Sequence, residues 1–178
     1  MKTSMDPVHD PGRPLDAMCH DIVTRYHAPL HHALPRIREV LTELADGDAP
    51  PAVDLMRVAF TALADMIEAH LAKEENLLFP ALTALSDAER SGGGRPPLPF
   101  ATILHPIRMM ESEHMRIESA LDQLREFARD VSGADASAPG WREYIDDLLR
   151  LDDDLRDQHR FENEVLFPAA LDLERRIL

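Results

Sequence analysis

The chain has 178 residues, 44% of them hydrophobic, which suits one domain with a single sizeable core. Its formal net charge of −14 repels nucleic acid phosphates and anionic membrane surfaces, so neither nucleic acid nor a membrane is expected as a partner. A single cysteine rules out an intrachain disulfide, and without a signal-like segment or an apolar run of about 20 residues the chain is predicted to be cytoplasmic.

The N-terminal region contains three prolines, Pro7, Pro11 and Pro14, and shows no hydrophobic periodicity. We therefore predict a flexible tail over residues 1–15 and one helical domain over residues 16–178.

The first predicted helix covers residues 16–45, where apolar residues recur at spacings of three and four. Its stripe comprises Val23, Leu30, Leu34, Ile37, Leu41 and Leu44. Pro29 and Pro35 lie inside the stripe and should kink or divide the helix, because proline lacks the N–H that a helix needs. The segment 46–51, which contains two prolines and a glycine, should end it.

Three more helices are predicted from the same periodicity. The second runs to about Phe79, where Pro80 should bend or restart it, and loops over residues 91–97 and 132–140 flank the third. The three apolar stripes are Met56, Phe60, Leu63 and Ile67; Ile107, Met110, Ile117, Leu121 and Leu124; and Trp141, Ile145, Leu148, Leu155 and Leu166. Helices of similar length joined by polar linkers predict an all-α fold, an antiparallel four-helix bundle.

An internal repeat relates two of the helix ends. Residues 74–81, EENLLFPA, resemble residues 162–169, ENEVLFPA, so two helical hairpins should face each other around a pseudo-twofold axis. That arrangement places equivalent residues on either side of the axis and suits a pair of metal ions.

Histidines and glutamates interrupt the apolar stripe of every predicted helix. They are His27, His70, Glu74, His114, Glu118, His159 and Glu162. A buried unpaired carboxylate is costly, and one cation in the core would neutralise these groups together. Imidazole with carboxylate suits iron, manganese or zinc, and inward Glu and His build the dimetal sites of helical bundles. The remaining histidines of the helices lie off the stripes or at a helix entry and are not expected to be ligands: His20, His31, His32 and His105.

A metal-free bundle with buried His–Glu hydrogen bonds is one alternative, because a lone inward histidine such as His27 is more often a core residue than a ligand. The placement of His70 and Glu74, four residues apart on one helix face and within a repeated motif, favours the metal site. The neighbouring acids should either face solvent or accept hydrogen bonds from the ligand imidazoles: Glu75, Glu113 and Glu164.

A series of motifs follows the same order along the chain: Tyr26-His27, His70-Leu71-Ala72-Lys73-Glu74-Glu75, Glu113-His114, and Glu162-Asn163, with Leu-Phe-Pro after both glutamate motifs. Over about residues 18–172 it resembles the hemerythrin-like proteins, and most closely the di-iron repair-of-iron-centres proteins, which answer nitrosative and oxidative stress. Those repair proteins commonly carry an N-terminal domain with cysteines, which the short tail here does not replace.

The resemblance implies that five residues bind two non-haem iron ions joined by an oxygen bridge (Fe–O(H)–Fe), with manganese or zinc as less favoured metals. They are His27, His70, Glu74, His114 and Glu162, and the two glutamates would bridge the ions.

The sixth ligand departs from the family pattern, which expects a histidine four residues before Glu162. This chain has Gln158 there and His159 one residue later. Measured from Leu155 at about 100° per residue, His159 lies about 40° to one side and Gln158 about 60° to the other. We therefore predict His159 as the ligand, with Gln158 as the alternative, a weak ligand or a hydrogen-bond donor.

Glu118 is a second departure, at a position where the family usually has a small residue beside the site. Its carboxylate should either point inward, as an extra ligand or an acid–base group, or turn outward to solvent.

The function that the resemblance implies is the handling of NO or O₂ by a di-iron centre, with repair of damaged iron–sulfur proteins under stress. The alternative is reversible O₂ binding, or sensing of O₂ or iron. The same residues serve both, so the sequence does not decide between an enzyme and a binding protein.

Overall fold

The computed structural model describes residues 12–46, 51–135 and 140–178, so residues 1–11 of the predicted tail lie outside the described residues. All regular structure in these ranges is helical, which confirms the all-α prediction. In chain order the elements are α1 (Leu15–Ile22), η2 (Val23–His27), α2 (Ala28–Ala45), α3 (Pro51–Lys73), η3 (Glu74–Leu78), α4 (Phe79–Ser91), α5 (Leu104–Asp135), α6 (Trp141–Phe161), η4 (Glu162–Leu166) and α7 (Phe167–Ile177), where η marks a π-helical turn.

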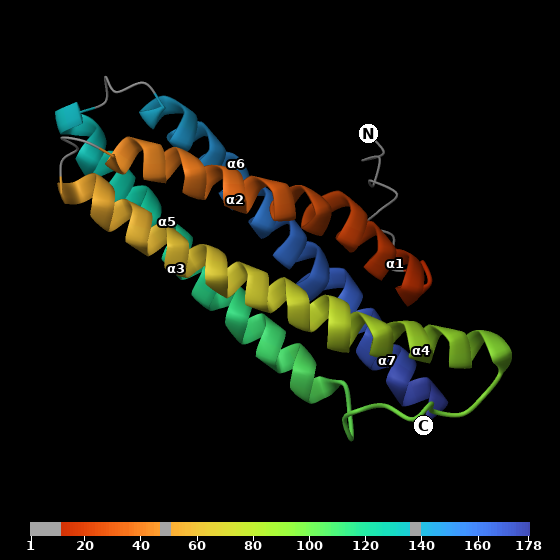
Figure 1. Ribbon diagram of the computed structural model, residues 1–178. Helices are drawn as coiled ribbons and strands as arrows, with labels where there is room; N and C mark the ends of the chain where they lie inside the picture. Colours follow the sequence, from red (N-terminus) through yellow and green to blue (C-terminus); the bar gives the residue numbers. More distant parts are fainter. Residues whose placement is uncertain (1–11, 47–50, 136–139) are drawn as a thin grey trace, which may run out of the picture.

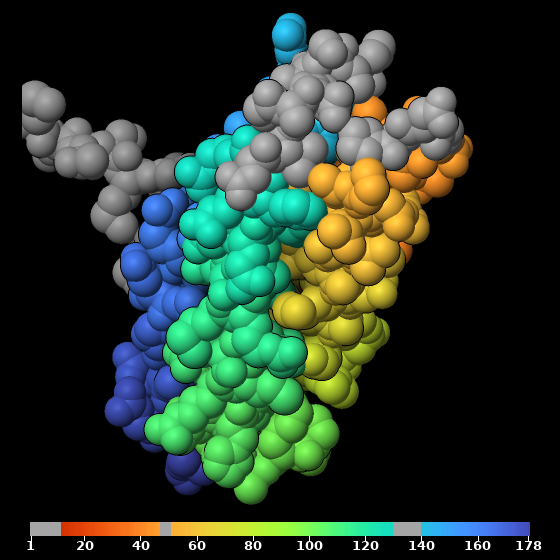
Figure 2. Space-filling view, turned by 90° about the vertical axis from the view of Figure 1, so that its left-hand side faces the viewer, coloured from red at the N-terminus to blue at the C-terminus, as the bar shows by residue number. Residues whose placement is uncertain are grey.

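These elements join into four long columns that alternate in direction along one axis: α1–η2–α2, α3–η3–α4, α5, and α6–η4–α7 (Figure 1). Contacts run from α2 to α3, α3 to α5, α5 to α6 and α6 back to α2, so the columns close a ring. Figure 2 shows α5 lying between the α3 column and the α6–α7 column. The predicted antiparallel four-helix bundle is confirmed.

Three of the columns contain a π turn, and a proline follows each turn at the second residue of the next helix: Pro29, Pro80 and Pro168. Proline cannot donate to the carbonyl four residues back and its ring crowds that carbonyl, whereas the wider π turn relieves the conflict. The helices therefore continue past these prolines. At Pro35, by contrast, α2 runs on as an ordinary α-helix.

Two predicted boundaries need correction. Helix α5 continues to Asp135, so the chain is still helical over 132–135, where a loop was expected, and residues 136–139 lie outside the described residues. Leu15, assigned to the tail, is the first residue of α1 and is buried. The predicted break after Ser91 is confirmed, because α4 ends there on Gly92 with a φ of 66°, a conformation that favours glycine.

Two apolar clusters fill the bundle, one towards each end. The first packs α2, α3, the C-terminal part of α5 and α6, and the second packs α1, α4, the start of α5 and α7. The predicted stripe residues populate both clusters, although Val23, Leu44 and Ile145 are only partly buried. None of the helices in the described part of the chain is long and apolar enough to cross a membrane.

Candidate metal centre

A layer of polar side chains lies between the two apolar clusters. Its members are almost completely buried: His27, His70, Glu74, His114, Gln158, His159 and Glu162, each at most 1% exposed. The four columns all contribute, through η2, through α3 and η3, through α5, and through α6 and η4. The structure thus brings together every residue of the predicted ligand set, and it places Gln158 and His159 in the layer together.

Three imidazoles converge on one side of the layer. The Nε2 atoms of His70 and His114 lie 3.2 Å apart, and ligand atoms of His70, His114 and His159 all lie within 4.8 Å of one another. The rings of His114 and His159 stack with centroids 3.9 Å apart. Two nitrogens bound to one ion at about 2.0–2.1 Å lie about 3.0–3.4 Å apart, so the spacing of His70 and His114 suits a shared ion.

Glu74 faces both sides of the layer. Its Oε1 lies 3.5 Å from His70 Nε2 and 4.0 Å from His114 Nε2, whereas its Oε2 lies 3.3 Å from His27 Nε2. A carboxylate with its two oxygens turned to different imidazoles is disposed to bridge two ions.

Glu162 is disposed in the same way. Its Oε2 lies 3.1 Å from His114 Nε2, and its Oε1 accepts a hydrogen bond of 3.1 Å from Gln158 Nε2. The same amide nitrogen lies 3.0 Å from His27 Nε2. The layer therefore has two halves. The three-histidine half contains His70, His114 and His159, and the His27 half contains His27 and Gln158.

Each histidine is held from behind through its Nδ1 atom. His27 pairs with Glu75 at 2.8 Å and His70 with Glu113 at 3.1 Å, which confirms the predicted role of these two acids as acceptors. Lys73 in turn pairs with Glu113. Glu164, the third acid of that prediction, is exposed to solvent, which was the other predicted alternative.

Asn163 and Glu118 complete this set of acceptors. Asn163 Oδ1 lies 3.0 Å from Nδ1 of His114, and Glu118 Oε1 lies 2.9 Å from Nδ1 of His159. Glu118 thus takes neither predicted position: it is half-buried behind His159, neither inside the layer nor free in solvent. Asn163 was missed as a functional residue, although the repeat aligns it with Glu75 and so contained the signal.

These pairings fix where the lone pairs of the imidazoles point. A neutral imidazole that donates from Nδ1 presents a lone pair on Nε2. His70 and His114 would then turn two lone pairs on each other across 3.2 Å, which is repulsive unless a proton or a cation lies between them.

Four buried atoms of the layer lack a hydrogen-bond partner: Glu74 Oε1, Glu74 Oε2, Gln158 Oε1 and His159 Nε2. Glu162 Oε2 has one only when His114 carries a proton on Nε2. Such atoms carry a large desolvation cost when unpaired. All of them are nitrogen or oxygen donors suited to a first-row transition metal, so the donor set fits a bound cation. Ordinary hydrogen bonding inside the layer, the metal-free alternative, leaves these atoms unsatisfied.

Burial and neighbouring charge shift the pKa values in the layer. Burial, and then the charge of His114, lower the pKa of His70 to about 4, so this imidazole is neutral and ready to bind a cation. Burial, and then the charge of Glu162, raise the pKa of Glu74 well above its ordinary value. Burial opposes ionisation of Glu162 too, but pairing with His114 outweighs it and its pKa is lowered.

The other histidines of the described residues lie outside the layer, as predicted: His20, His31, His32 and His105 are exposed. The Nε2 atom of His31 lies 3.4 Å from Glu75 Oε1, the oxygen that also pairs with His27.

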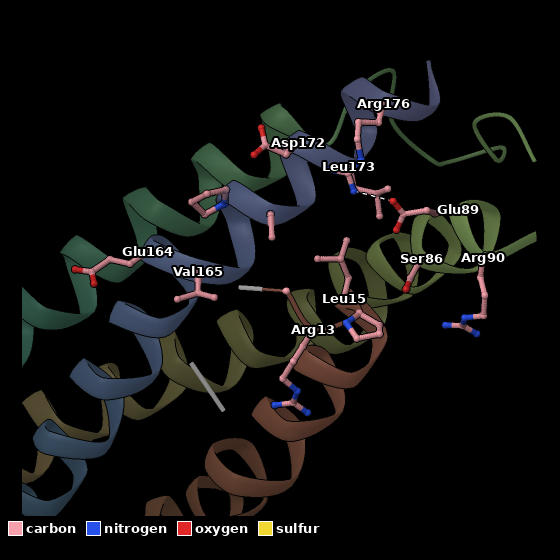
Figure 3. A pocket seen from close by; sticks show the side chains of 14 residues that line it. Arg13, Leu15, Ser86, Glu89, Arg90, Glu164, Val165, Asp172, Leu173 and Arg176 are labelled. Atoms are coloured by element: carbon pink, nitrogen blue, oxygen red, sulfur yellow. Dashed lines mark hydrogen bonds and ion pairs between the residues drawn. The ribbon is translucent and has the colours of Figure 1, made fainter. Parts of the chain in front are cut away.

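A surface pocket of about 580 Å³ near the chain's C-terminal end is a separate feature (Figure 3). Arginines and acids both line it, and Arg176 pairs with Glu89 at 2.7 Å. No residue of the buried layer lines this pocket. Its three arginines pair with acids, Arg176 with Glu89 of the lining, and Arg13 and Arg90 with Asp21 and Asp16 outside it.

The fold and the layer define a helical-bundle protein with a buried His/Glu site suited to metal ions. The Hemerythrin HHE cation binding domain matches the chain twice, over residues 20–99 and 101–176, and the chain belongs to this family. The two matches divide the chain into the two hairpins that the internal repeat predicts.

The chain is also similar to bacterial proteins named Iron-sulfur cluster repair protein YtfE. The protein of Escherichia coli O157:H7 is 28% identical over 174 residues, which are 96% of this chain and 73% of that protein. The protein of Salmonella typhimurium (strain LT2) is 29% identical over 160 residues, which are 89% of this chain and 67% of that protein.

Proposed function

We propose that this protein binds two non-haem iron ions in the buried layer and uses them to handle NO or O₂ in the repair of iron–sulfur clusters. The observation that carries the proposal is the placement of Glu74 and Glu162. Each turns one carboxylate oxygen to the three-histidine half and the other to the His27 half. The ligands would be His27, His70, Glu74, His114, His159 and Glu162.

The residues around the ions would hold the donors in one orientation. The Nδ1 acceptors keep each imidazole in the tautomer whose Nε2 lone pair faces the centre, and an acidic acceptor also makes the imidazole a stronger donor. When bound, the iron ions would supply a site where NO or O₂ is coordinated and exchanges electrons. The two apolar clusters exclude bulk water on either side of the layer.

The repair role is supported by the names of the similar proteins and by charge. A net charge of −14 attracts cations and suits a protein that exchanges iron with a client. The reducing cytoplasm that the single cysteine suggests would keep that iron ferrous and house iron–sulfur clients.

Reversible O₂ binding or sensing is the second candidate. The observation in its favour is the presence of a single imidazole, His27, beside Gln158, because fewer protein donors leave more room for a diatomic ligand at an ion there.

The decisive test begins with the iron content of protein purified without oxygen. Wild type should hold about two ions per chain, His70→Ala should lose iron, and His105→Ala, which removes an exposed histidine, should keep it. A wild-type chain that binds no iron would refute the proposal and leave a metal-free bundle.

A second experiment separates repair from O₂ binding. The reduced protein is mixed with an NO-inactivated iron–sulfur enzyme, and recovery of that enzyme's activity is compared between wild type and His70→Ala. Recovery with wild type only supports repair. No recovery, together with O₂ uptake that reverses when the pressure is lowered, would instead support the O₂-binding candidate.

A further inference from the structure

The repeat makes one residue of the layer stand out. His70 and Gln158 both lie four residues before the glutamate of their repeat, so Gln158 occupies the place of a second imidazole in the His27 half. His159, one residue later, contributes its imidazole to the opposite half. A step of one residue turns a helix by about 100°, which is enough to move a donor from one half of the layer to the other.

We propose that the two metal positions of this protein are unequal: the three-histidine half binds its ion tightly, and the His27 half binds the second ion weakly and exchanges it. This inference rests on the proposed function, because it assumes that the layer holds metal.

The three-histidine half has the donors of a tight site. Three imidazoles and two carboxylates converge there, and His70, Glu74, His114 and Glu162 form a second group whose ligand atoms lie within 4.8 Å of one another. Glu118 pairs with His159 Nδ1, so the added histidine comes with its own acceptor. His159 and Glu118 both depart from the family pattern. Together they supply the third imidazole of this half and the acceptor that orients it.

The His27 half is poorer in donors. Among the described residues, no group of three close His, Cys, Asp or Glu ligand atoms includes His27. Gln158 turns its amide nitrogen towards both His27 and Glu162, and an N–H group cannot bind a cation. To bind metal through Oε1, the amide would have to turn over and give up both contacts. Even then it offers a neutral oxygen, which suits iron less well than imidazole does.

The His27 half also lies next to the surface. Phe79 stacks on the His27 ring with centroids 5.7 Å apart, and Glu75 pairs with its Nδ1. Both residues line an open pocket of about 520 Å³, and the Glu75 side chain is 30% exposed. The Glu118 side chain behind His159 is 32% exposed as well, so it is the pocket, and not the exposure of the acceptor, that gives an ion at His27 a route for exchange.

The test is an anaerobic titration of metal-free protein with Fe²⁺, repeated with Co²⁺, whose visible absorption reports coordination. Removing even a hydrogen-bond partner of a ligand costs about 10–100-fold in affinity, so replacing a ligand imidazole should separate the two binding steps by at least about 100-fold. Two steps of equal affinity would overturn the inference. No binding in either step would instead refute the proposed function.

Two alanine variants assign the steps. His27→Ala should abolish the weak step and leave the tight step unchanged, whereas His159→Ala should weaken the tight step. The reverse result would overturn the assignment. Circular dichroism of each metal-free variant checks that the bundle is folded.

The Gln158→His variant tests whether Gln158 causes the difference in affinity between the two halves. It restores the imidazole that the repeat lacks and should strengthen the weak step by at least about tenfold, with little change in the tight step. If this variant leaves the second step unchanged, or if wild type and variant both bind one ion at every concentration, Gln158 is not the source of the difference.

Discussion

The two repeats, residues 74–81 and 162–169, share one backbone arrangement, but the residues four positions before their glutamates present different donors. In both, the glutamate opens a π turn, the turn is followed by Phe-Pro, and the side chain points into the layer. In the first repeat an imidazole stands four residues before the glutamate, and in the second an amide stands there. A shared backbone thus fixes where donors can lie, while single side chains decide what each half can bind.

Replacing Glu74 with glutamine should break both halves at once, because each oxygen of Glu74 faces imidazoles of a different half. We expect the affinity for both ions to fall by at least about 100-fold, measured as iron per chain after gel filtration. Glu164→Gln, which changes an exposed acid of the second repeat, is the matched control. Full iron retention in Glu74→Gln would contradict a bridging role.

The two glutamates should differ in the metal-free protein although the repeat makes them equivalent. Ionised Glu74 is disfavoured by burial and by Glu162, so Glu74→Gln should stabilise the metal-free fold by about 1–3 kcal/mol near neutral pH. Glu162→Gln should give no such gain, because it removes the charge that pairs with His114.

The sign of this effect follows from the raised pKa of Glu74. The unfolded chain ionises Glu74 above its ordinary pKa of 4.5, whereas the folded chain resists ionisation, so folding costs more as the pH rises. The gain from Glu74→Gln should therefore vanish below pH 4.5. Urea unfolding of both metal-free variants at several pH values measures it, and an equal gain from Glu162→Gln would contradict the distinction.

The residues that accept hydrogen bonds from the histidine Nδ1 atoms also differ between the two halves and can be tested separately. Glu118→Ala should weaken the tight step by about tenfold, and Glu75→Ala should weaken the other step, because each frees the Nδ1 of a histidine in a different half. Glu118→Gln keeps an acceptor and should restore most of the affinity. Titration with Co²⁺ checks all three, and loss of the same step in both alanine variants would disprove the division into halves.

The smallest expected effect is the pH dependence of the affinity for the tightly bound ion. Burial opposes protonation of His114, but pairing with Glu162 and the charge of Glu74 outweigh it and raise the pKa above 6.5. A metal must displace that proton, so affinity for the tight ion should fall by more than about twofold between pH 8 and pH 6.5. An affinity that is constant over this range would show that His114 does not lose a proton on binding.

Much of the fold could be predicted from the sequence, because a 3.6-residue period and proline-rich or glycine-rich breaks are local signals. The inward histidines and glutamates were also visible, since each interrupts an apolar stripe. The π turns were not predicted beyond bends at Pro29 and Pro80, and no bend was predicted at Pro168. Proline only forbids an ordinary turn, and neighbouring helices decide how the chain avoids it.

By itself, the sequence predicted that His27, His70, Glu74, His114, His159 and Glu162 would be buried together. It also put Glu118 on the same stripes and offered Gln158 as the alternative to His159. Only the tertiary structure decided which half of the layer each donor joins, where Gln158 turns its amide, and that Glu118 stands behind His159. The physical reason is that helical periodicity fixes the direction of a side chain to within tens of degrees, whereas donor pairing depends on distances of about 3 Å between helices.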